Sequence, residues 1–527
     1  MGWNFLLSTQ KMAKNPMITT IISKFQWFRN RLFHLFHYRA GATLDLIDTL
    51  AVTPTADSIV KLSLSNLFGR TYSSLTDVLS SLFRTNLKIS PTDEERREET
   101  LKVTQLLAEE CVANTVQNDP VLFAIDCTAD PRIYANKVRD RTMVHAPNHV
   151  PGQKPITVGH EYSILAYLPD REEDKEKHWV VPLSVKRVES HQSGPEVGLL
   201  QLKEIAYHTV FKSRLCISVT DAAYSTKDWV ISVNRWPHVV QIARVRGNRK
   251  FFRLPAPNSR TRRGRPQEYG KELVLQAPFE PDLEEVATMT TRKGKKCQVL
   301  LQRWNDVIMR GSKEERTHEH PFDLLKVTVT DRKGEPVYRR PLWVIIVGTR
   351  RREVRSKEAH IAYGRRYDIE HYFRFGKQRL GMVGSQTCET RHEENWHWIG
   401  LLAYNMLYYA RSLAQSIRYP REKKKIQVLS LIERPSQVQR DYNRIISEIG
   451  TPAPFPKPRG KSPGRQSGHK IGKRLDSPVI YKSAKNVESE NHPKKQKRAP
   501  RKRPIPLIKY VRMRRVWSKN RPTPIRC

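Results

Sequence analysis

The amino-acid sequence predicts an α/β domain with a β-rich insertion, preceded by a helical domain and followed by a basic, largely disordered tail. Three observations carry this prediction. Before residue 112 the apolar residues recur at helical spacing, and from about residue 120 short apolar runs alternate with helix-like segments. From residue 451 onward apolar residues become rare, and Pro, Lys, Arg and Ser dominate. A chain of 527 residues is long enough for several such domains.

The first segment, residues 1–115, is predicted to be a helical N-terminal domain. Stretches such as IISKFQWFRNRLFHLFHYRA carry apolar residues at helical spacing and show no strand-like alternation. Basic residues interleave with the aromatic ones, which fits either a DNA-binding domain or an ordinary amphipathic helix bundle. The sequence leaves both interpretations open.

Residues 116–420 are predicted to form the α/β domain. PVLFAIDCT, YSILAYL, HWVVPLSVKRV and RLCISVTDAAY read as strands, and EVGLLQLKEIAYHTVF reads as a helix. We expect Asp126 and Asp221 to lie at the carboxyl ends of the first and last of these strands. Ligands of open α/β sheets bind at that edge. The two acids therefore mark a candidate site.

A Pro/Gly/Arg-rich loop opens a predicted β-rich insertion at about residues 250–335, in which KKCQVLLQRW and LLKVTVT read as strands. LWVIIV, at 342–347, is predicted to return to the main sheet, and a helical region follows at about 357–417. Residues 421–450 are predicted to form a helical extension. The tail, 451–527, carries 23 Lys and Arg against 3 Asp and Glu. Such a composition cannot bury enough apolar surface to offset its ordering entropy.

The overall charge and the cysteines limit the classes of function. A formal net charge of +41 favours a polyanionic partner, of which nucleic acid is the first choice. No apolar run approaches the roughly 18 residues of a membrane span, so we expect no membrane association. The six cysteines are scattered without a CxxC pair, which argues against a zinc ribbon and a disulfide framework. A cytoplasmic protein with reduced thiols fits this pattern.

The stretch YGRRYDIEHYFRFGKQRLG, residues 363–381, mixes charges with bulky apolar residues. On a helix with about 100° per residue, Tyr363, Arg366, Glu370 and Lys377 share one face within roughly 60°. Taken alone, Arg366 and Glu370 are an ordinary i,i+4 surface pair. Together with Asp126 and Asp221, Glu370 completes a set of three carboxylates.

Three carboxylates suit divalent cations, because Mg²⁺ and Ca²⁺ prefer hard oxygen ligands. Two such ions can stabilise both the attacking and the leaving oxygen of an in-line phosphoryl displacement. Beside them, Arg366 can bind a backbone phosphate as a bidentate fork and Lys377 as a point charge. Asp130, Asp140, Asp228 and Glu161 are alternative acids for the metal.

Tyr363, Arg366, Glu370 and Lys377 reproduce the signature Y-x2-R-x3-E-x6-K. The chain thereby resembles bacterial insertion-sequence transposases with DDE chemistry, in the insertion sequence 4 (YREK) group. Asp126 and Asp221 fit the first two acids of that family, and the 149 residues from Asp221 to Glu370 suit its β-strand insertion. The resemblance covers about residues 119–415 and implies an RNase H-like core.

The resemblance implies a homodimer that cuts both terminal inverted repeats of a mobile DNA element and pastes the element into target DNA. It also implies two divalent ions, Mg²⁺ or Mn²⁺, held by Asp126, Asp221 and Glu370, and location in the bacterial cytoplasm at the nucleoid. Tyr363, Arg366 and Lys377 would bind the DNA. A metal-dependent nuclease without strand transfer and a domesticated DNA-binding protein without catalysis remain alternatives.

Two further features are candidate DNA contacts. Arg262, Arg263 and Arg265 lie in the RTRRGR loop, which can bind DNA or be an ordinary solvated loop. Trp304, in the insertion, can stack in the gap left by a flipped base. The alternative for Trp304 is a core tryptophan in a strand.

Overall fold

A computed structural model describes the protein over the following residues: 16–55, 58–113, 119–146, 154–170, 178–255, 267–290, 294, 296–385, 387–414, 434–456, 467–468, 472 and 474–481. All of them lie in one compact unit, Met1–Lys482. No helix in this described part is long and apolar enough to cross a membrane. The RTRRGR loop, with Arg262, Arg263 and Arg265, lies outside the described residues.

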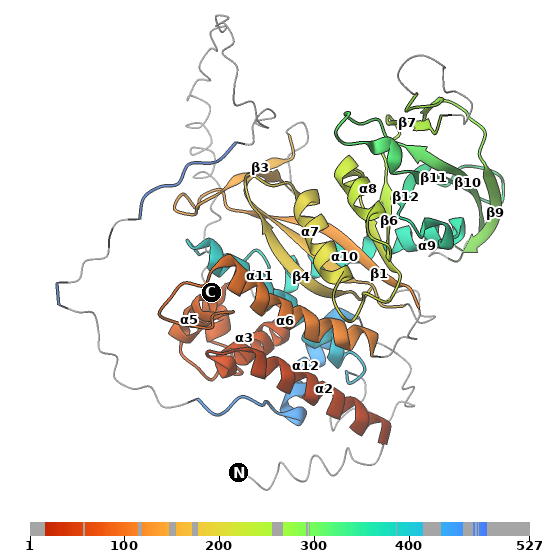
Figure 1. Cartoon of the computed structure of the whole chain (residues 1–527). Coiled ribbons are helices and arrows are strands. Elements are labelled where there is room, and N and C mark those ends of the chain that lie inside the picture. Colours follow the sequence, from red (N-terminus) through yellow and green to blue (C-terminus); the bar gives the residue numbers. More distant parts are fainter. Residues whose placement is uncertain are drawn as a thin grey trace, which may run out of the picture. The chain divides into compact units, whose positions relative to one another are not determined.

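A 12-stranded mixed sheet is the centre of the structure (Figure 1). Its strand order is β2-β3-β1-β5-β6-β12-β11-β10-β7-β8, with β4 paired to β3 and β9 paired to β10. The first strands are β1 (Val121–Pro131), β2 (Thr142–His145), β3 (Ile156–Tyr167), β4 (Val181–Val188), β5 (Cys216–Thr220) and β6 (Val239–Arg244). The elements between β4 and β6 are α7 (Gly194–Ala206), η1 (Ala222–Tyr224) and α8 (Lys227–Asn234). The predicted α/β class is confirmed, and the mixed sheet is compatible with an RNase H-like core.

The sequence predicted that Asp126 lies at the end of its strand, and this prediction is wrong. The parallel ladder between β1 and β5 ends at Ala124 and Val219. β1 then continues to Pro131 because its other neighbour, β3, pairs with it antiparallel along that whole length. Asp126 therefore sits in the middle of β1, just past the point where β5 stops. Asp221 directly follows β5, as predicted.

The β-rich insertion extends the same sheet. Its strands are β7 (Lys250–Arg253), β8 (Glu272–Val274), β9 (Leu283–Thr290), β10 (Lys296–Ile308) and β11 (Phe322–Thr330), with η2 (Thr317–Glu319) before β11. β12 (Leu342–Val347) pairs antiparallel with both β11 and β6, so it joins the insertion to the main sheet (Figure 1). The predicted return of LWVIIV to the sheet is confirmed.

The helices after β12 divide the region that the sequence predicted as one helical stretch. They are η3 (Arg351–Glu353), α9 (Ser356–Arg365), α10 (Tyr367–Arg379), α11 (Thr390–Ala410) and α12 (Pro435–Ile449). Leu380 ends α10, and the backbone of Gly381 has a φ of 55°. A left-handed residue stops a helix, so α11 begins as a separate element.

Two helices pack on opposite faces of β1. Gly194 and Gly198 of α7 face Cys127 and Ile125, and a Cβ at Gly198 would lie 3.0 Å from Ile125. Alternation along a strand then directs Asp126 to the other face, where α10 packs on β1 (Figure 1). This arrangement brings the second half of the YGRRYDIEHYFRFGKQRLG stretch to the first acid.

The N-terminal segment is helical, as predicted. Its described helices are α2 (Pro16–Leu35), α3 (Ala40–Val52), α4 (Ile59–Ser63), α5 (Tyr72–Ser81) and α6 (Asp93–Val112). They share one hydrophobic core with α11, α12 and β4 (Figure 1). Arg29, one of the basic residues among the aromatics, is buried and bonds Asp48 at 2.6 Å and Tyr442 at 3.3 Å. Arg29 is therefore structural, and the domain boundary near residue 115 stays a prediction.

Part of the predicted disordered tail has a defined position. Residues 474–481 run beside β2, where the backbone N–H of Ile480 bonds the carbonyl of Arg141 at 2.7 Å. The Arg141 side chain in turn donates to the carbonyl of Ser477 at 3.0 Å. This short segment pairs because the edge of β2 offers free backbone groups, which composition alone does not reveal.

Candidate active site

The sheet brings Asp126 and Asp221 together. β1 and β5 pair in parallel with a constant offset, from Val121 opposite Cys216 to Ala124 opposite Val219. Extending this register by two residues sets Asp126 opposite Asp221, with both side chains on the same face. Neighbouring strands lie about 4.8 Å apart. The two carboxylates are therefore close neighbours although 95 residues separate them in sequence.

The third acid, Glu370, lies in the first turn of α10, just after the break between α9 and α10. Arg366 is the C-cap of α9 and the N-cap of α10, and its guanidinium points to the sheet. Its Nη1 contacts Asp126 at 3.2 Å, and its Nη2 contacts Glu370 at 2.5 Å. The sequence predicted only the second contact, as an i,i+4 pair. The structure makes Arg366 a bridge between the strand acid and the helix acid.

The electrostatics of Asp126 show that the three acids act on one another. Burial raises the pKa of Asp126 from 3.8 to about 7, and the charges of Asp221 and Glu370 act in the same direction. Arg366 and the backbone N–H of Cys127 oppose this shift. Like charges this close disfavour ionisation. The cluster therefore lacks positive charge even with Arg366 present.

Two carboxylate oxygens at this site face no donor from the part of the chain that the structure describes. Asp221 Oδ1 accepts the backbone N–H of Ala223 at 2.8 Å, and Glu370 Oε1 accepts from Arg366. Among the described residues, no donor contacts Asp221 Oδ2 or Glu370 Oε2. Hard oxygen ligands with uncompensated charge are what a divalent cation requires. The donor set therefore fits such an ion.

Tyr363 lies at the same site, one turn before Arg366. Burial raises the pKa of its phenol, and the charges of Arg366 and Arg244 oppose the shift, whereas Asp221 adds to it. The hydroxyl is therefore protonated at neutral pH and can donate a hydrogen bond. Arg244, the last residue of β6, is a neighbour that no sequence motif indicated. Its position at the end of a central strand was the only available signal.

Lys377 does not join the three acids. Burial lowers the pKa of its ammonium group, and the acid whose charge opposes this shift is Asp130. Asp130 lies four residues beyond Asp126 and on the same face of β1, so α10 runs alongside the strand. The predicted basic face is thus spread along β1. Tyr363 and Arg366 lie at its first acid, whereas the charge of Lys377 interacts with the second.

Asp130 belongs to a buried ion network between β1, β3 and α11. Asp130, Glu393 and His397 each offer a ligand atom within 4.8 Å of the others, a spacing that could hold a metal ion. However, Glu393 already accepts from His160 at 2.8 Å and from Tyr162 at 2.8 Å. Arg132 contacts Asp130 at 3.0 Å and Glu393 at 3.1 Å. Protein cations thus already occupy this group, which we interpret as structural.

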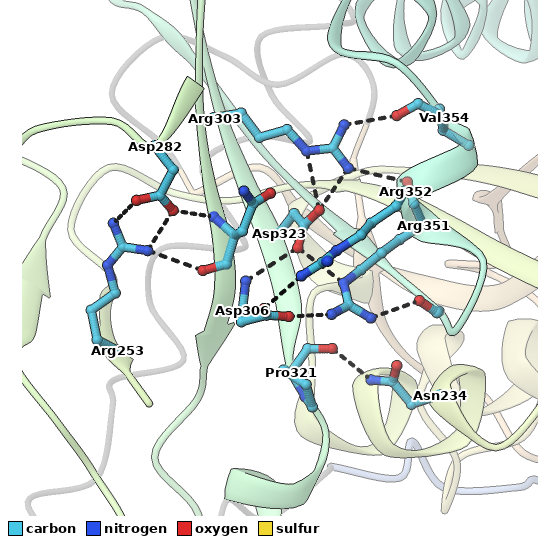
Figure 2. A network of polar contacts seen from close by, with 12 residues as sticks. Asn234, Arg253, Asp282, Arg303, Asp306, Pro321, Asp323, Arg351, Arg352 and Val354 are labelled. Atoms are coloured by element: carbon cyan, nitrogen blue, oxygen red, sulfur yellow. Dashed lines mark hydrogen bonds and ion pairs between the residues drawn. The ribbon is translucent and has the colours of Figure 1, made fainter. Parts of the chain in front are cut away.

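A second ion network fixes the start of α9, as Figure 2 shows. Arg303 of β10 binds the buried Asp323 of β11 at 2.6 Å and donates to the carbonyl of Val354 at 2.8 Å. Arg351 of η3 binds the other oxygen of Asp323 at 2.9 Å and also pairs with Asp306. The insertion thereby holds the backbone just before α9. Because α9 leads into Arg366, this network also fixes the segment that precedes Arg366.

The structure does not support a stacking role for Trp304. Its side chain is 1% exposed, and its indole N–H donates to the carbonyl of Glu280 at 2.6 Å. Its ring packs against Phe279 and Trp343 at centroid distances of 4.7 and 5.4 Å. No face of the ring is left for a base. Trp304 is a core residue because its strand turns this side chain toward the inside of the insertion.

The bridge made by Arg366 leads to a first prediction. Arg366→Lys keeps the charge but cannot reach Asp126 and Glu370 with one planar fork. We expect cleavage of DNA to fall by roughly 10–100-fold, as for residues that orient metal ligands. Kinetics of cleavage under single-turnover conditions would measure this. Arg374→Lys, on the exposed side of α10, is the matched control and should cleave at the parent rate.

Comparison with known protein families identifies one match. A family model described as DDE superfamily endonuclease matches residues 31–310. The match includes Asp126 and Asp221 and ends before Glu370. No curated protein matches the chain.

Proposed function

Because the chain belongs to the DDE superfamily endonucleases, we propose that it is a transposase that cuts DNA at the ends of a mobile element and joins those ends to target DNA. The family implies DNA as the substrate and divalent metal ions as cofactors. Cut-and-paste transposition, Mg²⁺ or Mn²⁺ as the metal, the terminal inverted repeats and a homodimer are the finer parts of the proposal. Membership of the insertion sequence 4 group is a further finer part of the proposal.

One observation carries the proposal. The helix pair α9–α10 sets Arg366 against both Asp126 and Glu370, and Asp221 lies within electrostatic reach of Asp126. The Y-x2-R-x3-E signature thus meets the first strand acid in space, although 240 residues separate Arg366 from Asp126 in the sequence. A chance surface salt bridge would have no reason to contact the first acid.

The residues of the chain have distinct parts in this chemistry. Asp126, Asp221 and Glu370 would hold the divalent ions, which activate water or a 3′-hydroxyl and stabilise charge on the phosphate. Arg366 orients two of the three carboxylates and can also face a phosphate oxygen as a fork. Tyr363 keeps its proton and can donate a hydrogen bond to the DNA backbone. Lys377, beside Asp130, is proposed to bind a phosphate further along the strand.

Two alternatives differ from this proposal in their products. A nuclease with the same site would cleave but leave the ends unjoined. A domesticated protein would bind DNA without cleaving it. The partly buried, mutually repelling acids favour a catalytic function, because holding them together without a cation costs stability.

The proposal is tested with the purified full-length chain and duplex DNA that carries the inverted repeats flanking its gene. We expect Mg²⁺-dependent nicking at the repeat ends, followed by joined products when target plasmid is added. Chelation by EDTA should remove both. Cleavage without joining would identify the nuclease alternative, and binding without cleavage would identify the domesticated one. Either result would overturn the proposed transposase.

A further inference from the structure

A second basic feature lies apart from the three acids. A cavity of about 830 Å³ opens beside the amino end of α11. Four segments far apart in the sequence form its walls: the end of α5, the start of α6, the turn after β1, and residues 474–477 of the tail. We call it the α11 cavity. Asp126, Asp221 and Glu370 do not line it.

The lining of the α11 cavity is strongly cationic. It contains one acid, Glu389. Its cationic side chains are Arg84, Arg96, Lys137, Arg139, Arg391 and Arg474. An unbalanced set of this size in a concave surface concentrates positive potential.

The acids that pair with these cations are mostly exposed and easily displaced. Arg391 contacts Asp93 at 2.9 Å, and the Asp93 side chain is 97% exposed. Lys137 contacts Asp476, which is 71% exposed, and Arg474 contacts Glu389, which is 54% exposed. Exposed pairs of this kind contribute only about 0–1 kcal/mol. A bound anion can therefore replace the carboxylates with little loss.

Arg96, another cation of the lining, is only partly neutralised by nearby acids. Arg96 is largely buried, and its Nη2 contacts Asn395 at 2.6 Å and Glu394 at 3.5 Å. Burial lowers the pKa of Arg96, and the nearby charge of Arg391 acts in the same direction, against Glu394. An anion between Arg96 and Arg391 would offset both the desolvation of Arg96 and its repulsion by Arg391.

The lining chemistry selects among anions. Among the described lining residues there is no Phe, Tyr or Trp, so the large aromatic rings that usually stack on bases are missing from it. Arginine forks match phosphate oxygens, and cations on four separate walls suit several phosphates better than one. We propose that the α11 cavity binds backbone phosphates of the duplex DNA on which the protein acts. This inference rests on the proposed function.

The site is preorganised by the buried network next to it. Arg391, His392 and Asn395 flank Glu393 on α11, and Glu393 is fixed by Arg132 and His160. The carbonyl of Arg139 accepts from the other ring nitrogen of His160 at 2.9 Å. Two walls of the cavity are thus held by one network. DNA bound there would have a fixed position relative to β1, which carries Asp126.

The test measures DNA binding without catalysis. The variant Arg84→Ala, Arg139→Ala, Arg391→Ala is made in the Asp126→Asn background, and its binding to fluorescent duplex DNA is followed by anisotropy at several salt concentrations. Each lost phosphate contact lowers the slope of log affinity against log salt by about 0.9. We therefore expect the slope to fall by about two to three and the affinity at low salt to fall roughly tenfold or more.

Two control variants are measured alongside the triple variant of the α11 cavity. Lys203→Ala, Lys212→Ala, Arg235→Ala removes three exposed cations elsewhere and should leave the slope nearly unchanged. Replacing the same three cavity arginines by lysine keeps their charge and should retain most of the slope. An unchanged slope in the cavity variant would overturn the inference. So would an equal fall in the distant control, or an equal fall in the lysine variant.

Cleavage separates this inference from the proposed function. If the Asp126-intact protein binds DNA with the expected dependence on the cavity but does not cleave it, the proposed function fails and the cavity assignment stands. If it cleaves DNA and the cavity variant keeps full affinity and slope, the cavity assignment fails alone. A protein that binds no DNA would overturn both.

Discussion

Replacing Asp126 by asparagine is expected to abolish Mg²⁺-dependent DNA cleavage, lowering the rate by roughly 10³-fold or more. Asparagine keeps the size of the side chain but removes the charge that a divalent ion needs. The fold should tolerate this change, because burial and the charges of Asp221 and Glu370 already oppose ionisation of Asp126. Asp221→Asn and Glu370→Gln should have the same effect. Single-turnover cleavage of labelled end DNA is the measurement.

The matched control is Asp228→Asn. Asp228 is an exposed acid in the first turn of α8, seven residues after Asp221, and it contacts none of the three acids. Its loss should cost only a few tenths of a kcal/mol of stability and leave cleavage intact. Each catalytic variant should still bind end DNA in the absence of metal. An Asp126→Asn protein that cleaves at the parent rate would refute the site.

Replacing Glu393 by alanine is expected to destabilise the protein by about 3–5 kcal/mol, the cost of removing one partner from a buried ion pair. Glu393 is fully buried and accepts hydrogen bonds from Arg132, His160 and Tyr162. The two ring nitrogens of His160 lie 2.8 Å from Glu393 and 2.9 Å from the carbonyl of Arg139. Alanine would remove this carboxylate from the buried guanidinium of Arg132. The midpoint of urea unfolding measures the loss.

A surface pair provides the control for this prediction. Arg31 and Glu109 lie 2.7 Å apart, and their side chains are 36% and 32% exposed. Glu109→Ala should therefore cost no more than about 1 kcal/mol. If both variants unfold at the same urea concentration, the network does not stabilise the fold.

The same network predicts a pH dependence. Burial would raise the pKa of Glu393, but the hydrogen bond from His160 and the charges of His160 and Arg132 outweigh it and lower the pKa from 4.5 to about 2. A depressed pKa adds stability above the unfolded value and loses it as the pH falls through the folded value. The stability difference between the parent protein and Glu393→Gln should therefore shrink from pH 4.5 to 2. A constant difference over this range would contradict the assignment.

Much of the fold was predictable because it depends on local patterns. Apolar runs marked β1, β3, β4, β5 and β12, and helical spacing marked α7 and the N-terminal helices. The position of Asp126 was predicted less well. Its apolar run ends at the acid, but β1 continues because β3 pairs with it beyond that point. Strand ends set by a neighbour leave no trace in the strand's own sequence.

For the candidate site, the sequence by itself determined which residues could share a face: the spacing of Tyr363, Arg366 and Glu370, and the equal placement of Asp126 and Asp221 after apolar runs. Only the tertiary structure decided what those faces meet. It joined Arg366 to Asp126 across 240 residues, brought Lys377 within electrostatic range of Asp130, buried Trp304, and collected six cations around the α11 cavity. The reason is physical. Periodicity reports the direction of a side chain from its own backbone, whereas its partner and its burial depend on segments that only folding brings near.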